Sequence, residues 1–235
     1  MYVYGSGFIA RNLKKIKIKK KDNVIIYAAG VSHSKSNNKK IYLKEIQKLN
    51  FFLKNYNKKN LLIYISSTSV LDRSLKKNSY VKNKKKVEEI IKRKLDNYLI
   101  LRLPQIVGKS NNPYTITNFI YKKIAKSQNF KVWSNVKRNL IDIDDIVKIT
   151  KKLIKKKLKY GKVINIQNPK STYVEDIALI LSKILNKKAK YKLVKYKYAG
   201  SKNLKIKKNL NFNLIISKYF KSKFYTENIL TKYYK

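Results

Sequence analysis

The sequence has no cysteine and a single histidine, His33. Without cysteine the chain has neither disulfide bonds nor thiolate metal ligands, and one histidine leaves little for a zinc site. We therefore expect a metal-independent, cytoplasmic protein. No run of about 18 apolar residues occurs, so we predict no membrane insertion. Residues 1–13 lack the basic leader of a signal peptide.

Acidic residues and arginine are also scarce. The chain has 12 Asp and Glu against 58 Lys and Arg, a net charge of +46. Only five of the basic residues are arginine, the side chain that readers of nucleic acid prefer for its planar, two-pronged donor. Lysine instead fills every segment together with Asn, Ile and Tyr, as expected of A/T-rich codons. We predict no specific nucleic-acid partner, although the positive field attracts anionic ligands.

Glycine is rare, but two of the six glycines stand close to the N-terminus. Gly5, Gly7 and Ala10 form a G-x-G-x-x-A pattern between a short apolar segment and a predicted helix over residues 8–16. Such a loop lets the backbone turn sharply and approach a pyrophosphate at the start of the helix. An ordinary strand-to-helix turn has the same appearance, so this pattern leaves both interpretations open.

Apolar runs alternate with segments of helical periodicity along the chain. The predicted strands are residues 1–4, 23–29, 61–66, 97–103 and 163–167. The predicted helices that follow them include residues 40–56, 79–95, 115–125, 144–156 and 173–185. This alternation predicts an α/β protein with a Rossmann-like parallel sheet and helices on both of its faces.

A polar segment, GKSNNP, begins at Gly108 and indicates a boundary. We expect a nucleotide-binding Rossmann core over residues 1–108, to which the strand at 162–168 returns. Residues 109–235 are expected to form mainly a small C-terminal substrate-binding lobe.

Tyr80 and Lys84 stand at positions i and i+4 of a predicted helix and share one face. A nearby ammonium stabilises a phenolate, which makes a tyrosine a usable proton carrier between an alcohol and a ketone. In a chain so rich in lysine and tyrosine, the same spacing also arises on a solvated helix turn.

Five segments occur in an order that resembles the extended short-chain dehydrogenase/reductases, the family of nucleotide-sugar epimerases and dehydratases. The segments are GSGFIA (5–10), NVIIYAAG (23–30), SSTSV (66–70) with YVKNKKKVEE (80–89), LILRLPQIVG (99–108) and RNLIDIDDI (138–146). The resemblance covers most of the chain up to about Leu185 and implies NAD or NADP as the cofactor.

The resemblance also implies roles for individual residues. The residues that would contact the cofactor are Gly5, Ser6, Gly7, Phe8, Ile9, Ala28, Ala29, Gly30, Ser66, Tyr80, Lys84, Pro104 and Gln105. Tyr80 would be the general acid/base, Ser67 would bind the reacting oxygen of the substrate, and Lys84 would hold the nicotinamide ribose.

For the substrate, a nucleotide-sugar, the resemblance assigns the diphosphate to Arg138, whose guanidinium suits it. Asn111 and Asn112 are the other candidates in the predicted lobe. Each has a plainer interpretation, Arg138 as a surface arginine and the two asparagines as ordinary loop residues.

The sequence departs from the family pattern at several places, among them Ala10, which replaces the last glycine of the loop. Tyr4 replaces an early glycine of the loop. The usual second strand, with its ribose-binding acid, has no room between the first helix and residue 23, which leaves NAD and NADP undistinguished. Thr68 and Ser69 stand where dehydratases of the family carry an acid pair, which disfavours dehydration and leaves an epimerase or a keto-sugar reductase.

We therefore predict an NAD(P)-dependent enzyme that transfers hydride to or from a nucleotide-linked sugar, and we allow for a homodimer. A catalytically silent Rossmann protein that binds NAD(P) or a nucleotide is the alternative. A lysine-rich nucleic-acid binder is a third hypothesis, which would show strongly salt-dependent affinity.

Overall fold

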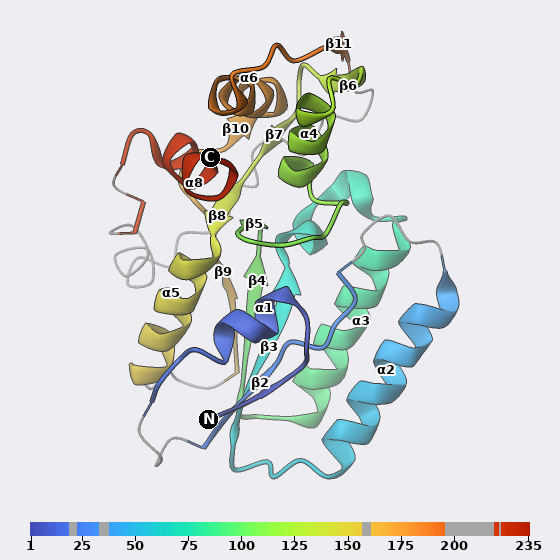
Figure 1. Cartoon of the computed structure of the whole chain (residues 1–235). Helices are drawn as coiled ribbons and strands as arrows, with labels where there is room; N and C mark the ends of the chain where they lie inside the picture. The colour runs from blue at the N-terminus through green and yellow to red at the C-terminus, as the bar shows by residue number, and fades with distance from the viewer. Residues whose placement is uncertain (19–22, 33–37, 157–160, 196–218, 221) are drawn as a thin grey trace. The chain divides into compact units, whose positions relative to one another are not determined.

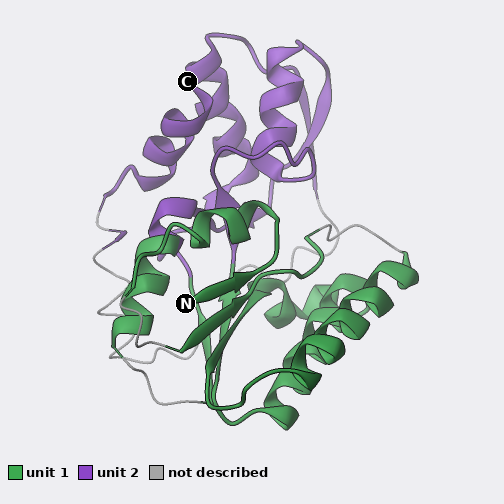
Figure 2. Ribbon diagram, turned by 60° about the horizontal axis from the view of Figure 1, so that its bottom comes forward, with its two compact units in different colours: residues 1–103, 147–166 green, residues 104–146, 167–235 purple. Residues whose placement is uncertain are grey.

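The structure is a computed structural model that describes residues 1–18, 23–32, 38–156, 161–195, 219–220 and 222–235. His33 lies outside the described residues. The chain forms two compact units (Figure 2): unit 1 consists of residues 1–103 and 147–166, and unit 2 of residues 104–146 and 167–235. That the first part binds nucleotide and the second binds substrate stays a prediction.

Unit 1 is built on a parallel sheet of five strands in the order β1-β2-β3-β4-β9. The strands are β1 (Tyr2–Tyr4), β2 (Val24–Tyr27), β3 (Leu61–Ser67), β4 (Tyr98–Leu103) and β9 (Lys162–Asn165). Each arises from one of the predicted apolar runs. Strands that read as nearly continuous apolar sequence belong in a sheet covered on both faces, so the predicted α/β class is confirmed.

Helices cover both faces of this sheet (Figure 1). On one face lie α2 (Lys39–Lys54) and α3 (Ser79–Lys94), which pack against Tyr27, Tyr64 and Ile100. On the other face lie α1 (Phe8–Leu13) and the part of α5 (Ile143–Lys155) that belongs to unit 1. Successive side chains of a strand point to opposite faces of the sheet. The strand residues next to Tyr27, Tyr64 and Ile100 in the sequence therefore contribute to the core on this second face.

The starts of α2 and α3 are fixed by asparagine caps. The Asn38 side chain accepts a hydrogen bond from the Lys40 backbone N–H, and that of Asn78 accepts one from Val81. These bonds satisfy N–H groups that have no partner within the helix. Between β3 and α3 the chain forms two short 3₁₀ helices, η1 (Thr68–Leu71) and η2 (Arg73–Leu75), which we had not predicted.

Among the strands that the structure describes, β1 lies at an edge of the sheet and pairs with β2. Residues 14–18 and 23, the described residues between α1 and β2, contain no strand. Residues 19–22 lie outside the described part of the chain, so the predicted loss of the family's second strand stays a prediction.

Unit 2 contains three strand pairs and three helices in its described residues. The pairs are β5 (Gln105–Val107) with β8 (Leu140–Asp142), β6 (Phe130–Trp133) with β11 (Tyr191–Val194), and β7 (Lys137–Arg138) with β10 (Thr172–Tyr173). The helices are α4 (Ile116–Ala125), α6 (Val174–Leu185) and α8 (Tyr225–Tyr234). No helix among the described residues is long and apolar enough to span a membrane.

Helix α8 is tied to the start of α5 by polar contacts. Lys232 forms ion pairs with Asp142 at 2.7 Å and Asp144 at 2.6 Å. The Tyr233 hydroxyl donates to Asp142 at 2.6 Å, and the Tyr225 hydroxyl accepts from the Asp142 backbone N–H at 3.0 Å. The acidic start of α5 is thus used to hold another helix of the unit.

Candidate active site

The loop between β1 and α1 contains two glycines with different surroundings. Gly5 has a φ of +132°, and a Cβ atom there would lie 2.6 Å from the Ala28 carbonyl oxygen. Only glycine allows this approach of the loop to the end of β2. Gly7 caps α1 without a side-chain hydrogen bond, and a Cβ there would meet nothing within 4 Å. The backbone at Gly7 is therefore open, which fits the approach of a pyrophosphate.

Tyr80 and Lys84 lie in the first turns of α3, and both are buried. The side chains are adjacent, with the Lys84 Nζ atom 5.6 Å from the centre of the Tyr80 ring. Lys84 is only 3% exposed, unlike its neighbours Lys82 and Lys85, which are exposed. The solvated helix turn that we kept as an alternative therefore does not describe this lysine.

The Lys84 ammonium has two polar partners inside unit 1. It forms an ion pair with Glu45 of α2 at 3.0 Å and a hydrogen bond with the Tyr64 hydroxyl of β3 at 3.2 Å. Glu45 also accepts hydrogen bonds from the Asn83 side chain at 2.8 Å and the Val31 backbone N–H at 3.1 Å. The result is a buried cluster of hydrogen-bonded polar groups beside the apolar core of unit 1.

The charge of Lys84 is maintained by this cluster. Burial by itself lowers the pKa of Lys84, but the neighbouring Tyr64 and Glu45 more than offset this and raise the pKa above its usual value. Burial raises the pKa of Tyr64, so its hydroxyl stays protonated. At neutral pH the site therefore holds a buried cation next to the Tyr80 ring.

Lys84 also lies directly against the segment that follows β2. A Cβ atom at Gly30 would be 2.3 Å from the Lys84 Nζ atom and 2.7 Å from the Glu45 Oε1 atom. A side chain at this position would have to displace the ends of both Lys84 and Glu45. The structure thus brings together Gly30 and Lys84, which the sequence had assigned separately to cofactor binding.

Two serines end β3, and their hydroxyls have different partners. Ser66 is buried and donates to Glu88 of α3 at 2.6 Å, and Glu88 is ion-paired with Arg102 of β4. The Ser67 hydroxyl accepts from the Ser69 backbone N–H and lies 2.9 Å from the Ser69 hydroxyl. Ser67 thereby starts η1, which packs against α3. Cofactor contact by Ser66 and substrate contact by Ser67 remain predictions.

The other predicted site residues belong to unit 2. Pro104 precedes β5, and the Gln105 backbone N–H donates to the Asn139 carbonyl at 3.2 Å. Asn111 and Asn112 lie before α4; the Asn112 carbonyl accepts from the Asn118 side chain. Arg138, in β7, lies over the Trp133 ring at 5.8 Å and donates to a backbone carbonyl. Their roles toward the cofactor or substrate stay predictions.

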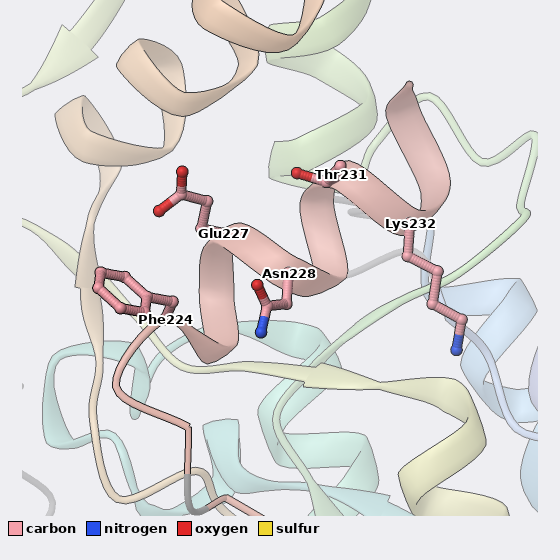
Figure 3. Close-up of a pocket in the computed structure, with 5 residues that line it drawn as sticks. All are labelled: Phe224, Glu227, Asn228, Thr231 and Lys232. Carbon is pink, nitrogen blue, oxygen red and sulfur yellow. The ribbon is translucent and has the colours of Figure 1, made fainter.

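A hollow of about 590 Å³ lies on α8 (Figure 3). Its lining is Phe224, Glu227, Asn228, Thr231 and Lys232, none of which is a predicted site residue. The Lys232 charge is already matched by Asp142 and Asp144, so this hollow offers no free cation to a ligand.

Three members of the cluster around Lys84 were missed in the sequence: Glu45, Tyr64 and Asn83. A signal for Glu45 was available. It is the only acidic residue of α2, and it recurs with Tyr42, Leu49 and Leu53 on the buried face of that helix. A lone carboxylate on an apolar helix face requires a buried cationic or N–H partner.

Comparison with known proteins identifies the family. The sequence profile of the NAD dependent epimerase/dehydratase family matches residues 8–166, well over half of the chain. The chain belongs to this family. No curated protein sequence matches it.

Solved structures of similar fold include an epimerase and a reductase. RMD from Pseudomonas aeruginosa, complexed with NADPH, is 14% identical, with 98% of this chain and 95% of that chain covered and a TM-score of 0.72. UDP-glucuronic acid 4-epimerase from Bacillus cereus, in complex with UDP-glucuronic acid and NAD, is 17% identical, with 97% and 77% covered and a TM-score of 0.71.

A reductase has the same fold. dTDP-4-dehydrorhamnose reductase from Bacillus anthracis, in complex with NADP, is 16% identical, with 85% of each chain covered and a TM-score of 0.67. At these identities the likeness establishes the Rossmann-like fold. The cofactors in these structures, NAD, NADP and NADPH, are of the predicted class.

Proposed function

We propose that this protein is an NAD(P)-dependent oxidoreductase acting on a nucleotide-linked sugar, as an epimerase or a keto-sugar reductase. The observation that carries the proposal is the buried, charged Lys84 held between the Tyr80 ring and the backbone of Gly30. The cofactor, when bound, supplies or accepts hydride. The chain's own residues bind it and move a proton.

In this proposal Lys84 donates to the nicotinamide ribose and stabilises negative charge on the neighbouring Tyr80 oxygen. Tyr80 takes the proton from the substrate hydroxyl, or returns it, as the general acid/base. Ser67 orients the reacting oxygen, for which its hydroxyl must leave Ser69 or share the bond. The open backbone at Gly7 receives the pyrophosphate.

Two observations favour epimerisation or reduction over dehydration. Thr68 and Ser69, in η1, offer hydroxyls where elimination of water needs carboxyl groups. The carboxylate nearest in sequence, Asp72, caps η2 and accepts from the Ser74 backbone N–H and hydroxyl. Neutral hydroxyls are poor acids and bases at neutral pH, so this segment has no group suited to elimination.

The proposal is tested by titrating the purified protein with NADH and NADPH and assaying Tyr80→Phe. We expect binding of at least one cofactor, and we expect Tyr80→Phe to lose turnover on nucleotide-sugars while keeping cofactor affinity. Full turnover by this variant would exclude Tyr80 as the acid/base. Mass spectrometry of the nucleotide that co-purifies separates the two activities: retained NAD favours an epimerase that recycles its cofactor, and an empty protein favours a reductase.

The role of Lys84 is tested by Lys84→Met against two neighbours on the same helix. Lys84→Met should weaken cofactor binding and lower turnover, because it removes the buried cation. Lys82→Met and Lys85→Met remove exposed charges and should change cofactor affinity little. Indistinguishable behaviour of all three variants would mean that the Tyr80–Lys84 spacing has no catalytic meaning.

A catalytically silent Rossmann protein is the second candidate, favoured by one observation. Among the described strands, β1 lies at an edge of the sheet, and the described residues before β2 supply no acid for the adenosine ribose. Absence of both cofactor binding and turnover on every nucleotide-sugar tried, in a well-folded preparation, would favour this candidate.

A further inference from the structure

Glu45 is a buried carboxylate to which the proposed chemistry gives no role. It is 4% exposed and accepts three hydrogen bonds, from the Lys84 Nζ at 3.0 Å, the Asn83 side chain at 2.8 Å and the Val31 backbone at 3.1 Å. These donors come from α3 and from the segment after β2, whereas Glu45 itself belongs to α2. Its position is therefore fixed by two other parts of unit 1.

The bonds to Glu45 and Tyr64 determine where the Lys84 amine can act. An ammonium has three N–H donors, and these two partners use two of them. The amine is held against Gly30, where even a methyl group would be 2.3 Å away. Among the described residues no partner takes the third donor, which lies near the carboxyl end of β2, the edge at which open parallel sheets bind their ligands.

We propose that Glu45 is the positioning residue of this site: it fixes the Lys84 ammonium over Gly30 and keeps it protonated, so that the remaining N–H is presented to the nicotinamide ribose. This inference rests on the proposed function, because it takes NAD(P) as the ligand of Lys84. It assigns Glu45 no contact with cofactor or substrate.

The groups around Lys84 explain why Glu45 is needed for its charge. The titratable groups that face it are Glu45 from α2, Tyr64 from β3, Tyr80 from α3 and Tyr27 from β2. Glu45 is the only carboxylate among them. Burial raises the pKa of both Tyr27 and Tyr64, so these two phenols carry no charge near neutrality. A buried ammonium without a counter-ion has a lowered pKa and gives up its proton at a lower pH than a solvated lysine does.

The test compares cofactor affinity across pH in the wild type and in Glu45→Gln, which keeps the shape of the side chain. We expect the wild-type Kd for NADH or NADPH to be nearly constant between about pH 6 and 9, because Lys84 stays charged. In Glu45→Gln the affinity should be lower by about tenfold and should fall further as the pH rises through the lowered pKa of Lys84. Lysine Nζ titration by NMR should show the same change without cofactor.

Glu88→Gln is the matched control. Glu88 is a second buried carboxylate of unit 1, and it forms an ion pair with Arg102 of β4. It should lower stability without making cofactor affinity depend on pH. A loss of affinity in Glu45→Gln that is equal at every pH, or no loss at all, would overturn the role of Glu45. If the wild type itself binds neither cofactor, the proposed function fails, and this role fails with it.

Gly30→Ala serves as a second variant should Glu45→Gln not fold. Its methyl group must displace the Lys84 amine while Glu45 keeps its charge. We expect weaker cofactor binding with the flat pH dependence of the wild type. Unchanged affinity in Gly30→Ala would show that the position of the amine does not matter and would contradict the proposal.

Discussion

At the scale of single residues, the Lys84 ammonium depends on partners that are distant in the sequence. Glu45 and Tyr64 are 39 and 20 residues away along the chain. No motif spacing indicates such partners, whereas the separation of Tyr80 and Lys84 follows from helix geometry and could be predicted. Only the packing of α2 and β3 against α3 makes Glu45 and Tyr64 neighbours of Lys84.

Gly5 and Gly7 should respond differently to alanine. Gly5→Ala forces a side chain into a φ of +132° and against the Ala28 carbonyl, so we expect a loss of roughly 2–3 kcal/mol in unfolding free energy. Gly7→Ala meets no atom within 4 Å and should leave stability unchanged while weakening NAD(P)H binding. Urea denaturation and cofactor titration of both variants check this; equal stability of the two would contradict the strain at Gly5.

Tyr27 contributes a buried hydroxyl with no hydrogen-bond partner among the described residues. Tyr27→Phe removes that unpaired group and should raise the unfolding free energy by about 1 kcal/mol. Tyr64→Phe is the control, since its hydroxyl binds Lys84, and it should lower stability by about 1 kcal/mol or more. Chemical denaturation measures both, and destabilisation by Tyr27→Phe would show that its hydroxyl is satisfied in solution.

At the scale of elements, the major strands and helices were predictable because their apolar periodicity is long. The short pieces were not: η1, η2 and the two-residue strands β7 and β10 have too few residues for any period to appear. The 3₁₀ helices matter to the site because they form most of the connection between Ser67 and the helix that carries Tyr80. Ser67 and Asp72 cap these helices with their side chains. Serine and aspartate favour such local hydrogen bonds, so these two residues could have indicated the turns in the sequence.

The end of α6 offers a test of local backbone strain. Asn186 terminates the helix with a φ of 48°, and the next N–H, that of Lys187, bonds back to the Ser182 carbonyl. Asn186→Gly should stabilise the protein by up to about 0.5 kcal/mol, and Asn186→Ala should destabilise it by about 1 kcal/mol. Thermal denaturation of the two variants provides the measurement; the reverse order would exclude a left-handed helix end.

At the scale of the whole molecule, tyrosine makes stability depend on alkaline pH. Burial raises the pKa of Tyr27, Tyr56, Tyr64 and Tyr225 above the ordinary value of 10.0. Above that value an unfolded chain loses these protons and the folded chain keeps them. The unfolded state therefore binds fewer protons, and stability falls as the pH rises.

We expect a plateau of stability through neutral pH and a steep decline above about pH 10. Lys84 adds to the decline in the same direction, since its pKa is also raised in the fold. Unfolding followed by circular dichroism should coincide with the appearance of tyrosinate absorbance. Tyrosinate that appears well before unfolding would mean that these side chains titrate within the folded protein.

The attachment of α8 has a consequence for synthesis of the chain. Tyr234 binds Thr117 across 117 positions, and Tyr233 binds Asp142 across 91. A growing polypeptide emerges from the ribosome in order, so Thr117 and Asp142 are made many seconds before the helix that satisfies them, at roughly 5–20 residues per second. Unit 1 can close once β9 has emerged, whereas unit 2 lacks the contacts that α8 supplies until residue 234 has been added.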